Sequence, residues 1–246
     1  MGLTRYWGLV RSLVVYYRPP KRKQWVRFYR KLFSENALVF DIGAHVGSRT
    51  RFMRSAGARV VALEPQQPFA KFLRRFLPAD VEFIEAAAGA NETEAEMAVS
   101  SLNPTVSSLK TDFVSSANDS PGFERVNWDK KQKVKVTTLD ALIESFGTPD
   151  YIKIDVEGYE LEVLKGLTNP VKLLSIEFLP SLPSLTEAVL QRLVSLGEYE
   201  FNITHGEKAE FKWENWQNLT ELKSWMSGQP AKAKPSDIFA RLIGEN

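Results

Sequence analysis

A short acidic, glycine-containing segment and a later carboxylate have the residue types and spacing needed to bind a nucleoside. Residues 40–47 read FDIGAHVG, and Glu64 lies 23 residues after Asp41. Gly43 and Gly47 allow a tight turn in which the backbone comes close to a ligand. The Glu64 carboxylate can accept hydrogen bonds from both hydroxyls of a ribose. The pattern therefore favours a nucleoside-bearing cofactor.

The glycine spacing does not match a dinucleotide site. The dinucleotide fingerprint has glycines at the third and sixth positions counted from its first glycine, and this chain has His45 and Ser48 there. The acid before the turn, Asp41, suits a ligand that presents an amine rather than phosphates. S-adenosylmethionine carries an amino-acid tail and a ribose, so we expect it as the cofactor. A dehydrogenase on a dinucleotide fold is the disfavoured alternative.

Apolar runs that alternate with helix-like stretches must position these residues. Strands are expected at residues 37–40, 58–63, 81–87, 134–138, 151–155, 173–178, 199–203 and 237–242. Helices are expected directly after Gly47 and at residues 139–146, 159–167 and 187–196. This alternation favours a mostly parallel sheet covered on both faces. Ligands of such sheets bind beyond the carboxyl ends of the strands, where the strand order reverses.

Three segments, in this order, resemble FkbM-type methyltransferases: residues 41–47 (DIGAHVG), 62–65 (ALEP) and 153–160 (KIDVEGYE). The resemblance spans residues 37–179. It implies an α/β fold of class I methyltransferases, a Rossmann-like doubly wound sheet of about seven strands, mostly parallel with an antiparallel last strand. It also implies O-methyl transfer from S-adenosylmethionine to a hydroxyl of a sugar, glycan or natural product. A catalytically idle scaffold or membrane-docked binding protein that keeps the fold is the alternative.

The expected cofactor-binding residues lie at the carboxyl ends of the first four core strands. They are Asp41, Gly43, Ala44, His45, Gly47, Glu64, Pro65, Ala86, Ala87 and Asp155. The small side chains of Ala86 and Ala87 leave room for a purine, although alanines also suit tight packing between helix and sheet. Ser107 and Ser108 are weaker candidates for polar contacts.

Methyl transfer to a neutral hydroxyl also needs a group that removes the hydroxyl proton, which contributes about two to four orders of magnitude in rate. Asp155 is the first candidate because it ends a strand at the expected cleft. Glu157 is the second, with capping of the following helix as the alternative. His45 and His205 are further candidates for this base. The alternative for each is that it has no direct role. No metal is expected, and an ion on Asp155 and Glu157 is the alternative.

Two further residue types have a structural and a functional interpretation. Lys153 lies in an apolar strand and needs a partner there; we expect an ion pair with Glu177 in the adjacent strand rather than a catalytic lysine. Three tryptophans of the region before the last strand could anchor that region to the core or stack on a sugar ring. They are Trp213, Trp216 and Trp225, and anchoring is favoured.

Length and composition fit one catalytic domain at residues 34–246, after a basic, aromatic helical extension at residues 1–33. The 246 residues, 43% of them hydrophobic, can bury a full core. Residues 89–133 are expected to form an insertion near the active site, and residues 205–236 a connection before the last strand. The 0 Cys exclude disulfides and a cysteine nucleophile, and the 2 His argue against a multi-histidine metal site.

The net charge of +2 hides an asymmetry. Nine Lys and Arg fall between Arg5 and Lys31 and no acid precedes Glu35, so the rest of the chain has 23 basic and 30 acidic residues. An acidic catalytic part argues against a nucleic-acid acceptor and leaves a small molecule or glycan. The basic arm is expected to pack as a helix, with contact to an anionic membrane surface as the alternative. No secretion signal or membrane span is evident, so a cytoplasmic location is expected.

Overall fold

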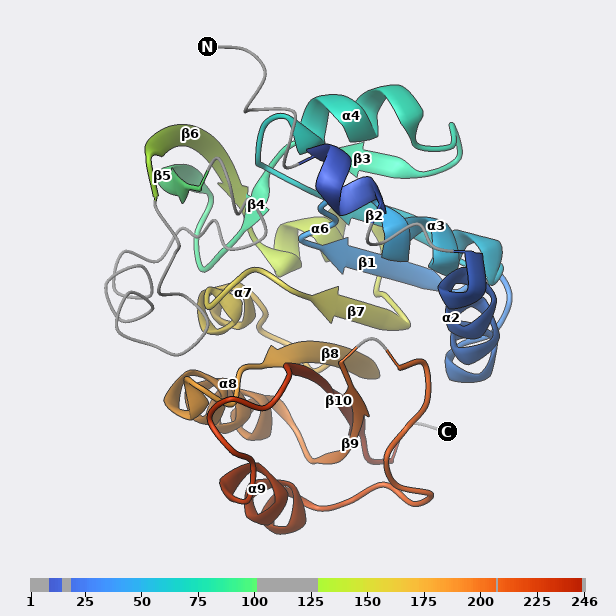
Figure 1. Ribbon diagram of the computed structural model, residues 1–246, viewed down its shortest axis with the longest axis vertical. Helices are drawn as coiled ribbons and strands as arrows, with labels where there is room; N and C mark the ends of the chain where they lie inside the picture. Colours follow the sequence, from blue (N-terminus) through green and yellow to red (C-terminus); the bar gives the residue numbers. More distant parts are fainter. Residues whose placement is uncertain (1–8, 15–18, 101–127, 207, 245–246) are drawn as a thin grey trace.

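The computed structural model describes residues 9–14, 19–100, 128–206 and 208–244, and a seven-stranded sheet forms its centre (Figure 1). The order of the strands is β3-β2-β1-β7-β8-β10-β9. Their bounds are β1 (Leu38–Ile42), β2 (Arg59–Leu63), β3 (Glu82–Ile84), β7 (Tyr151–Ile154), β8 (Leu173–Phe178), β9 (Tyr199–His205) and β10 (Ser236–Leu242). Strand β10 runs antiparallel to β8 and β9, and the pairs from β3 to β8 are parallel. The expected class I methyltransferase sheet is confirmed.

Successive residues of the strands face two separate cores, as the alternation of side chains along a strand requires. Phe40 and Ile42 of β1 belong to the core that also contains residues of α6, α7, α8 and α9, whereas Val39 belongs to the core with α2, α3 and α4. The helices are α2 (Pro19–Leu32), α3 (Ser48–Ser55), α4 (Phe69–Phe76), α6 (Leu139–Phe146), α7 (Glu160–Lys165), α8 (Pro183–Leu196) and α9 (Leu219–Ser227). Helices therefore cover both faces of the sheet.

Helix α2 shows that part of the basic N-terminal region packs on the sheet. Trp25, Phe28 and Tyr29 are buried, and the ring of Phe28 lies edge-on against Phe239 of β10 with 5.6 Å between centroids. The packed-helix interpretation is confirmed for α2, and most of the preceding residues lie outside the described part. In the described part of the chain, no helix combines the length and apolarity that crossing a membrane would need.

The strand order reverses between β1 and β7, as expected. The chain runs from β1 outward through β2 to β3, and then returns to the other side of β1 to form β7 and β8. The loops after β1 and β7 therefore lie side by side at the carboxyl edge of the sheet, where open α/β sheets bind ligands.

One expectation about the elements was wrong. The expected third strand at residues 81–87 is split: β3 ends at Ile84, and β4 (Ala87–Ala88) pairs with β6 (Lys130–Thr137) in a second sheet that also contains β5 (Thr93–Val99). After β3 the chain turns, with the N–H of Ala86 donating to the carbonyl of Ile84 at 3.0 Å, and Ala87 then pairs with Val136 of β6 rather than with β2. Helices α4 and α9 were not among the expected elements. Ser107 and Ser108 lie outside the described residues.

Candidate active site

A cavity of about 500 Å³ opens beyond the carboxyl ends of β1, β2 and β7. Most of the site residues predicted from the sequence line it: Gly43, Ala44, His45, Glu64, Pro65, Ala86, Ala87, Asp155 and Glu157. Asp41 and Gly47 do not line it. The sequence reasoning missed several lining residues from other elements, which are Ser48, Arg49, Gln66, Met97, Tyr159, Glu177, Lys234 and Asp237.

Gly43 allows the loops after β1 and β7 to touch. A Cβ atom at this position would lie 1.9 Å from the carbonyl oxygen of Asp155, and its φ of +83° is in the left-handed region. The backbone N–H of Asp155 donates to the carbonyl of Ile42 at 3.0 Å. The glycine is therefore needed for the close approach of two backbone segments. From the sequence we predicted only a tight turn with its backbone close to a ligand.

Replacing Gly43 by alanine is expected to lower the thermal unfolding midpoint, because rigid backbone atoms occupy the space of the new Cβ. Gly147→Ala is the matched control, since Gly147 also has positive φ (+98°) but its nearest neighbour would lie 3.8 Å from a Cβ. We expect Gly43→Ala to have a Tm about 5–10 °C below that of Gly147→Ala in differential scanning calorimetry. Equal midpoints would contradict the close contact.

Asp41 and Gly47 lie behind the cavity wall and shape the turn. The buried Asp41 carboxylate accepts a hydrogen bond from the Thr50 hydroxyl at 2.6 Å. Gly47 has a φ of +72°, and a Cβ there would lie 2.7 Å from Leu73 of α4. Both residues thus help to fix the position of the loop after β1 relative to α3 and α4. Direct contact of either with the cofactor stays a prediction.

Glu64 presents a buried carboxylate at the end of β2. It accepts hydrogen bonds from the backbone N–H groups of His45 at 2.7 Å and Gln66 at 2.8 Å. Burial raises the pKa of Glu64 to about 7, and these two bonds oppose the rise. Each carboxylate oxygen still has acceptor capacity. Glu64 is thus held in one orientation and can accept two further hydrogen bonds.

His45 serves the site through its backbone, whereas its ring packs against a neighbour. Its φ of +51° is in the left-handed region, and its N–H donates to Glu64. The ring lies edge-on against Phe69, with 4.4 Å between centroids. Burial lowers the pKa of His45 to about 4. An imidazole with this pKa is neutral at pH 7 and is a weak base there.

The expected ion pair between Lys153 and Glu177 was wrong. The Lys153 ammonium lies 2.9 Å from Asp155 and 3.8 Å from Asp41. The reason is the strand register: Lys153 pairs with Asp41 on one side and with Ser175 on the other, so Glu177 lies two residues farther along β8. Burial alone would lower the pKa of Lys153, but the two aspartates outweigh it and raise that pKa.

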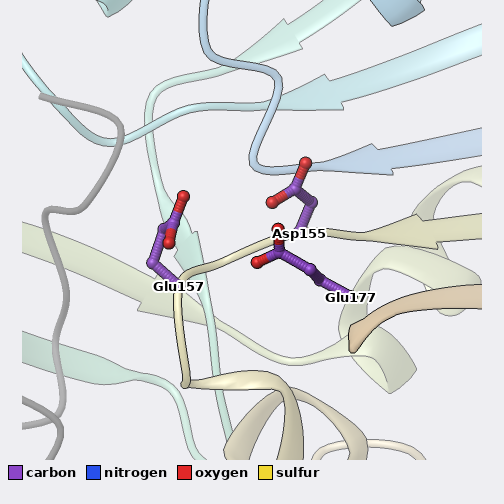
Figure 2. Close-up of side chains that lie close together, drawn as sticks. All are labelled: Asp155, Glu157 and Glu177. Atoms are coloured by element: carbon purple, nitrogen blue, oxygen red, sulfur yellow. The ribbon is translucent and has the colours of Figure 1, made fainter. Parts of the chain in front are cut away.

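Three carboxylates that line the cavity lie close together (Figure 2). Asp155 follows β7, Glu157 lies in the loop after it, and Glu177 is near the end of β8; one oxygen of each lies within 4.8 Å of the others. In the described part of the chain, these three side chains are the one set of possible metal ligands close enough together to share a cation. Glu177 could have been suspected from sequence, because it ends a strand adjacent to the one that Asp155 ends.

These three acids have different ionisation behaviour. Burial alone would raise the pKa of Asp155, but the ion pair with Lys153 lowers it below normal. Burial raises the pKa values of Glu157 and Glu177 well above normal, and neighbouring carboxylates add to the effect. The helix-capping alternative for Glu157 was wrong: Tyr159 is the N-cap of α7, and no side chain of the described residues caps it. The N–H of Gly158, just before α7, instead donates to the Glu160 carboxylate at 3.1 Å.

The segment between β9 and β10 lines the cavity at both of its ends, with Gly206 at one end and Lys234 and Pro235 at the other. Its tryptophans anchor it to the cores. Trp225 packs edge-on against Phe178 and Trp213, and Trp216 packs against the other core, so anchoring is confirmed. His205 is exposed at the end of β9, with its ring against Trp225. Neither His205 nor any of these three tryptophans lines the cavity.

Comparisons with known proteins agree with this architecture. A family model described as "Methyltransferase FkbM domain" matches residues 41–229. Over 151 residues the chain is 28% identical to the hexuronic acid methyltransferase AglP of Haloferax volcanii. That match covers 60% of this chain and 56% of the relative, so it spans little more than half of the relative's length.

Solved structures of two methyltransferases resemble the chain at a distance. A TehB-like SAM-dependent methyltransferase from Corynebacterium glutamicum has a TM-score of 0.48 and 8% identity, with 96% of each chain covered. A precorrin-6Y C5,15-methyltransferase from Geobacter metallireducens has a TM-score of 0.47 and 13% identity, with 90% of this chain and 86% of that chain covered. At TM-scores below 0.5 these similarities carry no argument about function.

Proposed function

This chain belongs to the FkbM methyltransferase family, and we propose that it transfers a methyl group from S-adenosylmethionine to a hydroxyl of a sugar or glycan. What supports this most directly is the cavity, which collects Glu64, the turn at Gly43 and the acids that follow β7 at one edge of the sheet. The similarity to a hexuronic acid methyltransferase supports a sugar acceptor.

The residues present fit this cofactor. The cavity volume of about 500 Å³ is in the usual range for small-molecule sites. The oriented Glu64 carboxylate would hold the ribose hydroxyls, and the small side chains of Ala86 and Ala87 would lie beside the adenine. When bound, S-adenosylmethionine supplies an electrophilic methyl group on a positively charged sulfur. Asp155, kept ionised by Lys153, provides negative charge in the same cavity.

Alignment of the acceptor is the main task left to the protein, because a well-oriented pair of reactants can gain about 7–11 kcal/mol over reactants free in solution. Residues from several elements of the cavity lining would contact the acceptor. These include Glu157 and Glu177 as acceptors of hydroxyl hydrogen bonds, and Lys234 as a cation at the rim. Such a mixture suits an oxygen-rich acceptor such as a sugar.

Calorimetric titration with S-adenosylhomocysteine, with NADH as the parallel control, tests the cofactor. Micromolar binding of S-adenosylhomocysteine alone is expected. Incubation with methyl-labelled S-adenosylmethionine and a panel of uronic acids, neutral sugars and their glycosides then tests the acceptor. Label is expected in at least one sugar. Binding of NADH alone would contradict the proposed cofactor, and binding of neither would favour the idle scaffold.

A further inference from the structure

Glu157 and Glu177 both line the cavity and approach each other there from different elements. Glu157 follows β7, with a strained left-handed φ of +52°, and Glu177 lies near the end of β8. With Asp155, each contributes an oxygen to a group of ligand atoms that all lie within 4.8 Å of one another. Figure 2 shows these three side chains. Oε2 of Glu177 is buried and has no hydrogen-bond partner among the described residues.

Few positive charges balance these acids. Lys153 is committed to Asp155 and Asp41, at 2.9 and 3.8 Å. Glu160 contributes a further buried carboxylate, and Asp237 pairs with Glu177 in the register between β10 and β8. The charged or titratable groups that line the cavity or act on the pair come from several elements. They are Asp155 and Lys153 from β7 and its end, Glu64 after β2, Tyr159 before α7, Glu160 from α7, Asp237 from β10, Lys234 before β10, and His45 and Arg49 from the first loop and α3.

Glu157 and Glu177 are half-buried. Two neighbouring carboxylates that are partly removed from water cannot both ionise cheaply, and one of the two then titrates at a higher pH than usual. We propose that Glu157 and Glu177 retain one proton between them at neutral pH, and that the carboxylate of this pair is the base that accepts the proton of the acceptor hydroxyl. The inference rests on the proposed function. It replaces Asp155, which Lys153 keeps ionised, as the first candidate for the base.

The step balances in atoms and charge. The acceptor oxygen forms a bond to the methyl carbon, while the bond between that carbon and sulfur breaks and its electron pair stays on sulfur. The hydroxyl proton goes to the ionised member of the pair, so that both glutamates are then protonated. One proton returns to solvent before the next turnover. A base with a pKa close to the working pH is the kind that proton transfer favours.

Thermal unfolding of Glu177→Gln between pH 5 and pH 8 tests the retained proton without any acceptor. A carboxyl group whose folded pKa is raised binds more protons in the folded state, so its contribution to stability is lost as pH rises. At each pH, the Tm of the wild type is subtracted from the Tm of Glu177→Gln. This difference should be about 2–4 °C higher at pH 8 than at pH 5. Glu144→Gln, at an exposed position of α6, is the control and should show no such trend.

Two outcomes of this experiment would overturn the retained proton. One is a difference in Tm between Glu177→Gln and wild type that does not change with pH. The other is an increase in the wild-type Tm on addition of magnesium or manganese chloride that Glu177→Gln lacks, since ligands stabilise the state that binds them. The second result would assign a divalent cation to the three acids.

Turnover measurements test the role as base. With any acceptor found by the labelled screen, Glu157→Gln and Glu177→Gln should each lower kcat by about 100-fold or more, while S-adenosylhomocysteine affinity stays within about threefold. Full activity of both variants would overturn the base but leave the methyltransferase function intact. A wild type that binds no S-adenosylhomocysteine and labels no acceptor would instead contradict the proposed function itself, and the base with it.

Discussion

Replacement of Lys153 by methionine should destabilise the protein by about 3–5 kcal/mol, because it leaves the buried Asp41 and the half-buried Asp155 without their cation. The Lys153 side chain is almost fully buried and its ammonium lies between Asp155 and Asp41. For a chain of this size the loss corresponds to a Tm lower by about 6–20 °C. Part of the loss should be recovered as pH falls toward 5, since the unpaired aspartates can then take up protons.

Two further variants distinguish this explanation from a general effect of losing a lysine. Lys223→Met removes an exposed ion pair with Glu187 and should change the free energy of unfolding by no more than about 1 kcal/mol. The double variant Lys153→Met with Asp41→Asn should be more stable than Lys153→Met alone, because it removes one of the two unpaired charges. If the double variant were as unstable as the single one, the charge explanation would fail.

Glu64→Ala is expected to weaken S-adenosylhomocysteine binding by about 10- to 150-fold, the equivalent of roughly 1.5–3 kcal/mol for a hydrogen bond to a charged group. The carboxylate is already oriented by the N–H groups of His45 and Gln66, so no ordering cost arises on binding. Calorimetric titration measures the effect, with Glu144→Ala as the exposed control. Affinity equal to that of the wild type would exclude Glu64 as the ribose ligand.

The pH dependence of binding provides an independent check on Glu64. Burial raises the pKa of Glu64 to about 7 in the free protein, and the ionised form is the one that accepts from both ribose hydroxyls. Between pH 8 and pH 6 the ionised fraction falls about tenfold, so affinity should fall by up to this factor. In Glu64→Gln this component should be absent. Parallel pH curves for wild type and Glu64→Gln would contradict it.

Much of the fold and part of the site could be predicted because the relevant signals are local. The turn at residues 41–47 and the acid at Glu64 are recognisable from spacing alone. The structure brings them to one cavity with Asp155, as the motifs of the FkbM family imply. Most strand positions also agree with the structure, because a buried strand is a short apolar run and requires no knowledge of its partners.

The failures concern pairings between distant parts of the chain. Residues 81–87 (VEFIEAA) form one uninterrupted stretch with no Gly or Pro, and nothing in them reveals that Ala87 pairs with Val136 instead of continuing beside β2. Likewise, Lys153 and Glu177 lie in adjacent strands, but only the register determines that Lys153 lies opposite Ser175. A shift of two residues along a strand is enough to exchange one ionic partner for another.

The sequence by itself determined the family, the class of sheet and the loop that turns at Gly43, since these depend on residue types at short and constant spacings. The tertiary structure alone decided which acids are balanced by a cation. Asp155 and Asp41 lie beside Lys153, whereas Glu157 and Glu177 approach each other from separate strand ends. The physical reason is that the ionisation of a buried group depends on burial and on charges a few ångströms away, and these distances exist only in the folded chain.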